Sequence, residues 1–189
     1  MQIFEYVAVL TSIVIGLGIT HLLQGVARII QHPGRERLYS VHLTWVAYMF
    51  VNAVFWWWWE FRLSELDAWT FQIYLFVILY AVNIYLLCAL LFPADLAGYD
   101  GYKDYFYSRR RWFFGLAAFS FAIDYLDSWV KGPEHLANLG LEYLIAAPLQ
   151  TVLLVAAAFT REERFHRVLA IAALAYQMSA ALRYFETMG

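Results

Sequence analysis

The sequence predicts an all-α, polytopic integral membrane protein: a single domain over residues 1–189 built as a bundle of six transmembrane helices. Three observations lead to this fold class: the composition, the length of the uncharged runs, and the placement of the basic residues. Hydrophobic residues make up 63% of the chain. Charged residues make up 15%, against roughly 25% in soluble domains. With a mean hydropathy of +0.57, this composition argues against a disordered chain, a nucleic-acid-binding protein and an ordinary cytosolic enzyme.

Long runs without a charged residue define most of the helices. A helix rises about 1.5 Å per residue, so about 20 residues cross the ~30 Å hydrocarbon core of a bilayer. Four runs of 18 to 27 residues contain no charge, and two further runs qualify when one or two charges are allowed. We therefore predict helices near residues 4–27, 41–60, 69–92, 112–130, 138–159 and 168–187.

The first three predicted helices follow from apolar segments alone. The N-terminal segment has no Lys or Arg, carries Glu5 and is too long for a cleaved signal peptide, so we expect it to be retained. The second helix ends in four tryptophans, residues 56–59, a composition typical of the membrane interface. The third covers the longest uncharged run. After it, residues 93–111 contain Gly98, Gly101 and four tyrosines, and we predict a non-helical loop lying on the lipid headgroups.

The last three predicted helices each carry a distinguishing feature. The fourth has four polar residues that share one helical face because of their spacing: Ser120, Asp124, Asp127 and Ser128. The fifth contains Pro148, which removes a backbone donor and commonly bends a membrane helix. The sixth is rich in alanine, and in its run from Val168 to Phe185 it has a single charge, Arg183.

The basic residues predict how the bundle is oriented. Ten of the 13 Lys and Arg residues fall in or beside the loops after the first, third and fifth helices. Because such loops remain in the cytoplasm, both termini are expected outside, N-out and C-out. Nine acidic and three basic residues fall on the other side. We therefore expect a multi-pass protein of the cytoplasmic (inner) membrane with an acidic outer face.

Polar side chains deep in the predicted helices are candidates for function because they are costly in hydrocarbon. Five lie roughly 13–18 Å from the inner boundary: Asn52, Asn83, Asp124, Gln150 and Gln177. His21 lies at about 9 Å, with Gln24 nearly one turn below it. Hydrogen bonding between helices, at about 0.6 kcal/mol each, accounts for such residues. A hydrated pathway or a polar binding pocket is the alternative.

A second group lies higher, near the acidic face. Asp127, Glu142 and Arg183 fall at similar heights on three helices, with Asp124 beneath them. They predict either an ion pair that fixes helix packing or an entry site for a cation or proton. For His21 we leave two roles open, helix packing and contact with a proton or ligand. Haem held by two histidines would need a second histidine deep in a predicted helix. A single cysteine excludes a CxxC site, and we predict no metal and no cofactor.

These residues favour a small channel or transporter for a cation or proton, entered through the acidic outer face. The alternative is a non-catalytic accessory subunit or sensor whose polar residues only hold helices together. An intramembrane enzyme or redox subunit is disfavoured, because a nucleophile motif and a ligand set are missing from the sequence. Expected partners are the lipid bilayer, a proton or small cation, and a second copy or another membrane protein, but no nucleic acid. Self-association rests on a stripe of small residues: Ala8, Ser12, Gly16 and Thr20.

Overall fold

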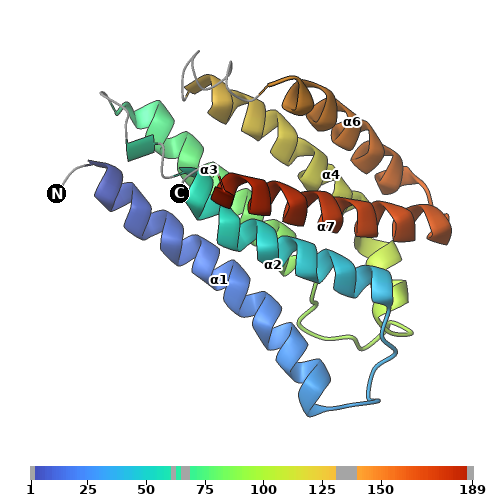
Figure 1. The fold of residues 1–189 in the computed structure, drawn as a ribbon. Coiled ribbons are helices and arrows are strands. Elements are labelled where there is room, and N and C mark those ends of the chain that lie inside the picture. Colours follow the sequence, from blue (N-terminus) through green and yellow to red (C-terminus); the bar gives the residue numbers. More distant parts are fainter. Residues whose placement is uncertain (1–2, 61–62, 65–68, 131–139, 187–189) are drawn as a thin grey trace.

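The computed structural model describes residues 3–60, 63–64, 69–130 and 140–186. Within these ranges the chain forms six α-helices and no β-strand, which confirms the predicted all-α class. The helices are α1 (Ile3–Gln31), α2 (Ser40–Glu60), α3 (Phe71–Ala89), α4 (Tyr102–Val130), α6 (Gly140–Phe159) and α7 (Glu163–Glu186) (Figure 1).

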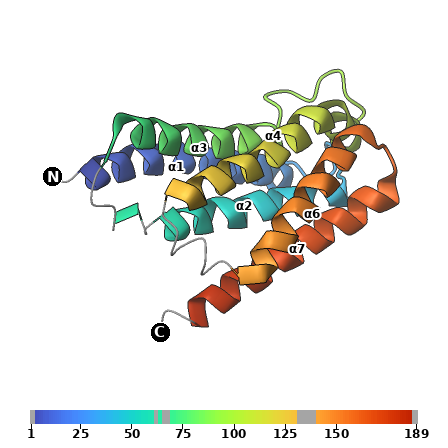
Figure 2. The same cartoon turned by 90° about the horizontal axis from the view of Figure 1, so that it is seen from above.

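The helices pack side by side as a bundle. Following their contacts in order, α1 meets α3, α3 meets α4, α4 meets α6, α6 meets α7, α7 meets α2, and α2 returns to α1. The central member is α2, because it also contacts α3 and α4 (Figure 2). Its buried side chains Trp45, Met49 and Trp56 form the middle of the core. Figure 1 shows α6 and α7 separating as they leave the turn that joins them.

The observed helix bounds lie within five residues of the predicted ones except at the start of α4, which comes ten residues earlier. Residues 93–111 were expected to be non-helical, but α4 begins at Tyr102, so that half of the expected loop is helical. The preceding Gly101 has a φ of +116° and contacts Arg37, which sets the point where the chain turns into the helix. The expectation failed because a search for apolar runs locates the membrane and does not detect a helix that continues beyond it.

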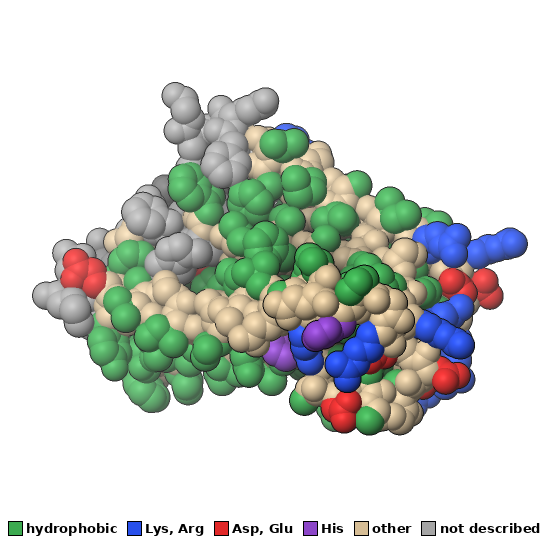
Figure 3. Space-filling model, turned by 90° about the horizontal axis from the view of Figure 1, so that it is seen from below, with side chains coloured by type: hydrophobic (Ala, Val, Ile, Leu, Met, Phe, Trp, Pro, Cys, Tyr) green, Lys and Arg blue, Asp and Glu red, His purple; other side chains and the backbone are tan. Residues whose placement is uncertain are grey.

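Three helices are long and apolar enough to cross a membrane by length and composition: Phe4–Gln31, Phe71–Ala89 and Glu163–Arg183. The apolar parts of α2 (Ser40–Trp56) and α6 (Ile145–Phe159) are shorter. Large hydrophobic side chains cover much of the outside of the bundle, while Lys and Arg gather at one end (Figure 3). Such a surface suits lipid contact in a multi-pass membrane protein. Six spans and their orientation stay predictions.

Two glycines of α1 that lie close to other parts of the chain are outside the predicted stripe of small residues. A Cβ added at Gly25 would lie 2.2 Å from the ring of Phe92, and one at Gly18 would lie 3.4 Å from Cys88 Sγ. Gly16, which belongs to the stripe, has no atom within 4 Å of such a Cβ. Ser12 in the same stripe is exposed. The seam with α3 therefore uses a different face, and self-association through the stripe stays a prediction.

Candidate functional site

Asp124 lies in the interior of the bundle between two tyrosine hydroxyl groups. It is a half-buried residue of α4. The Tyr143 hydroxyl, from α6, donates to Asp124 Oδ2 at 2.5 Å, and the Tyr80 hydroxyl, from α3, donates to Oδ1 at 3.5 Å. One carboxylate thus joins three helices. Because hydroxyl groups both donate and accept, this arrangement is suited to holding a proton or coordinating a cation through oxygen atoms.

A second polar contact lies about one helical turn from the first. Asn83 Nδ2 donates to Ser120 Oγ at 2.7 Å, and Ser120 Oγ donates to the carbonyl of Leu116 at 3.1 Å. Tyr80 and Asn83 are three residues apart on α3, and Ser120 and Asp124 are four apart on α4, so each pair shares one face. The two helices therefore face each other with a polar strip that runs from Asp124 toward the basic end.

Side chains from the two remaining interior helices complete the surroundings of Asp124. Tyr48 of α2 interacts electrostatically with both Asp124 and Tyr176 of α7. Near this level of α7, Gln177 is buried, and its Nε2 atom has no hydrogen-bond partner among the described residues. Side chains of three other helices, α2, α3 and α6, thus bond to or interact with the carboxylate of Asp124. Asn52 and Gln150, also predicted to lie at this depth, are half-buried.

His21 belongs to a different region, at the basic end. Its Nε2 atom bonds to the carbonyl of Phe92 at 2.9 Å. Three other side chains hold the neighbouring carbonyls of residues 90–94, and with His21 we call them the carbonyl clamp: Arg28, His42 and Tyr105. These carbonyls belong to the end of α3 and the segment after it, where a helix leaves acceptors unsatisfied. The hydrogen bond of His21 therefore holds α1 against the segment that follows α3. Gln24 is exposed.

The predicted cluster near the acidic face is only partly described. The side chains of Asp127 and Glu142 lie outside the described residues. Arg183 is exposed, and its Nε donates to the carbonyl of Ser179 at 3.4 Å. The entry site that these three residues would form with Asp124 stays a prediction.

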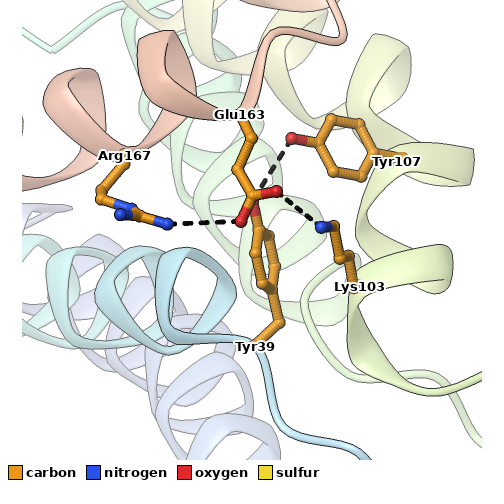
Figure 4. A network of polar contacts seen from close by, with 5 residues as sticks. All are labelled: Tyr39, Lys103, Tyr107, Glu163 and Arg167. Carbon is orange, nitrogen blue, oxygen red and sulfur yellow. Dashed lines mark hydrogen bonds and ion pairs between the residues drawn. The ribbon is translucent and has the colours of Figure 1, made fainter.

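A network of polar contacts at the basic end ties three segments together (Figure 4). Glu163 at the start of α7 accepts from Lys103 Nζ at 2.6 Å and pairs with Arg167 at 3.4 Å. Beside it, the hydroxyls of Tyr39 and Tyr107 lie 3.2 Å apart. Burial is the main cause that raises the pKa of Tyr39, so this hydroxyl keeps its proton. The network links the starts of α2, α4 and α7, and its ion pairs are solvent-exposed.

Sequence reasoning missed the tyrosines that bond to or interact with Asp124, namely Tyr48, Tyr80 and Tyr143. One signal was available for Tyr48 and Tyr80, because these two lie well inside α2 and α3 while interfacial tyrosines lie at helix ends. Their convergence on one carboxylate depends on helix packing, which spacing along a single helix does not reveal.

Among the described residues no group of three or more His, Cys, Asp or Glu side chains could hold a metal ion. Comparison with protein-family models, curated proteins and solved structures yields no match for this chain. The function is therefore argued from the geometry around Asp124.

Proposed function

We propose that this protein is a small membrane channel or transporter that moves a proton or a small cation through its helix bundle, with Asp124 as the group that binds it. The observation that carries the proposal is the bonding of Asp124, whose two carboxylate oxygens accept hydrogen bonds from tyrosines of two different helices. A carboxylate in a membrane helix is expensive, and such residues mark ion and proton pathways.

The surrounding groups have roles that follow from their chemistry. Tyr80 and Tyr143 orient the carboxylate and provide oxygen atoms next to it. Asn83 and Ser120 extend the polar strip toward the basic end. In this proposal Asp127 and Glu142 attract the cation at the acidic face, with Arg183 balancing their charge.

The proposal is tested by measuring proton and cation flux in proteoliposomes of the wild-type chain, of Asp124→Asn and of Asp100→Asn. The Asn side chain keeps the shape of Asp and removes its charge. Asp100 is exposed in the segment before α4, so its substitution is a matched control. We expect flux above that of protein-free vesicles for wild type and Asp100→Asn, and a loss of about tenfold or more for Asp124→Asn, since a full carboxylate charge is removed.

Two results would contradict the proposal. The first is flux at the level of empty vesicles from wild-type protein that is folded and inserted. The second is an equal flux from wild type and Asp124→Asn. Circular dichroism and size-exclusion chromatography of each variant establish that the protein is folded before flux is compared.

A second candidate function, a non-catalytic accessory subunit or sensor, is favoured by one specific observation. Two of the polar residues singled out by their depth make hydrogen bonds that hold the bundle together: Asn83 joins α3 to α4, and His21 joins α1 to the segment after α3. If all the polar residues serve packing, Asp124→Asn lowers thermal stability, wild-type flux is absent, and gentle purification recovers a partner protein in fixed stoichiometry. Recovery of this chain alone would count against the accessory role.

A further inference from the structure

Three arginines meet where α4 packs against the turn between α6 and α7. Arg110 is buried, and its Nε donates to the carbonyl of Thr160 at 3.1 Å. The guanidinium of Arg111 lies 5.8 Å from the centre of the Phe159 ring. Arg161 follows Thr160 directly in the chain. Two neighbouring arginines of α4 thus contact two neighbouring residues of the turn, and this places the third arginine beside them.

The charges of these three arginines are mutually repulsive. Burial lowers the pKa of Arg110, and the nearby positive charges of Arg161 and Arg111 lower it further. Arg111 and Arg161 are exposed, and neither forms an ion pair with an acidic side chain in the part of the chain that the structure describes. The nearest paired acid in the sequence, Glu163, binds Lys103 and Arg167 instead. The cluster is complementary to an anion.

An apolar stripe begins at this cluster and follows α6 along the outside of the bundle. Its members recur at helical spacing and are all exposed: Ile145, Leu149, Val152, Val155 and Phe159. Their 14-residue separation corresponds to about 21 Å along the helix, comparable to one leaflet's acyl chain and part of its headgroup region. Trp112, 67% exposed and adjacent to Arg111, has the amphipathic ring typical of the interface.

We propose that Arg111 and Arg161 bind the phosphate of an anionic phospholipid, whose acyl chain lies along the exposed stripe of α6. The buried Arg110, whose guanidinium donates to the carbonyls of Thr160 and Tyr107, adds positive charge behind them. Guanidinium groups match phosphate oxygens with paired hydrogen bonds, which favours phosphate over other anions. Basic clusters beside membrane helices select anionic lipids. The lipid covers an apolar helix face and neutralises like charges that the described residues leave unpaired.

The test compares lipid binding to detergent-purified full chain by native mass spectrometry, with phosphatidylglycerol and phosphatidylcholine of identical acyl chains as probes. The site variant is Arg111→Gln with Arg161→Gln. The control is Arg35→Gln with Arg37→Gln, which removes two exposed charges from the loop between α1 and α2. We expect wild type to prefer phosphatidylglycerol by at least about tenfold. The site variant should lose about 30-fold in affinity, the effect of two basic side chains near an anionic surface, and the control less than about threefold.

Several results would overturn the proposal. Equal affinity of wild type for the two lipids is one, and an equal loss in both variants, which indicates attraction by overall charge, is another. Full displacement of phosphatidylglycerol by millimolar inorganic phosphate would show a site for free anions. Should the double variant not fold, the single variants Arg111→Gln and Arg161→Gln are compared with Arg35→Gln in the same titration. Each site variant should then lose about fivefold in affinity, the effect of one basic side chain, and the control less than about twofold.

Discussion

The carbonyl clamp and the surroundings of Asp124 both use polar side chains inside a hydrophobic bundle, but they use them differently. In the clamp, His21, His42 and the other members bond to backbone carbonyls of residues 90–94. Around Asp124, Tyr80 and Tyr143 bond to another side chain. The first arrangement satisfies backbone acceptors in the segment that follows α3. The second places a carboxylate between hydroxyl groups of two other helices.

On the proposed function, we expect this difference to separate polar residues that stabilise the fold from those that take part in transport. Substitutions in the clamp are expected to change the free energy of unfolding, because a carbonyl buried without a donor costs about 1–3 kcal/mol. Substitutions around Asp124 are expected to change flux more than stability.

Gly25→Ala is expected to destabilise the protein by about 1–3 kcal/mol, the usual cost of overpacking. The new methyl group would lie 2.2 Å from the ring of Phe92, a buried residue whose carbonyl binds His21. Gly16→Ala is the matched control on the same helix, because nothing lies within 4 Å of its Cβ position. Chemical unfolding in detergent measures both. Equal stability of the two variants would show that α1 is not tightly packed against Phe92 at the basic end of the bundle.

Tyr143→Phe is expected to cost about 0.6 kcal/mol of stability, the average for a hydrogen bond between membrane helices. Its effect on flux is expected to exceed that of Tyr80→Phe, because the Tyr143 hydroxyl is 2.5 Å from Asp124 while that of Tyr80 is 3.5 Å away. Flux in proteoliposomes and unfolding in detergent are measured on the same preparations. A large loss of stability with unchanged flux would mean that the residues around Asp124 stabilise the fold and do not take part in transport.

Glu163→Gln is expected to have the smallest effect. Its carboxylate pairs with Lys103 and Arg167, but all three side chains are partly or largely exposed, and exposed ion pairs contribute little. The midpoint of thermal unfolding should fall slightly at low salt and be unchanged at high salt, where the charges are screened. Glu162→Gln, at the exposed neighbouring residue, is the control. A loss that persists at high salt would mean that the network of Figure 4 stabilises the fold through more than charge.

The element bounds were predictable because the signal is local. Uncharged runs are imposed by the hydrocarbon core, and they located α2, α3 and α6 to within a few residues. The same method missed the first ten residues of α4, since Lys103 and the arginines that follow are compatible with a helix but not with the membrane interior. Asp124 was found from its depth and from the polar face that it shares with Ser120. The partners of His21 and Asp124 were not found, because they come from residues 71 and 19 positions away in the chain.

The sequence by itself determined that this chain forms apolar helices and that its basic residues gather at one end, because hydropathy and charge are properties of consecutive residues. Only the tertiary structure decided which polar residues meet. His21 and Asp124 look alike in the sequence, as single polar residues in apolar helices. Packing places one against the carbonyl of Phe92 and the other among tyrosines of neighbouring helices. The physical reason is that a hydrogen bond depends on a few ångströms between helices, which the pattern along a single helix does not contain.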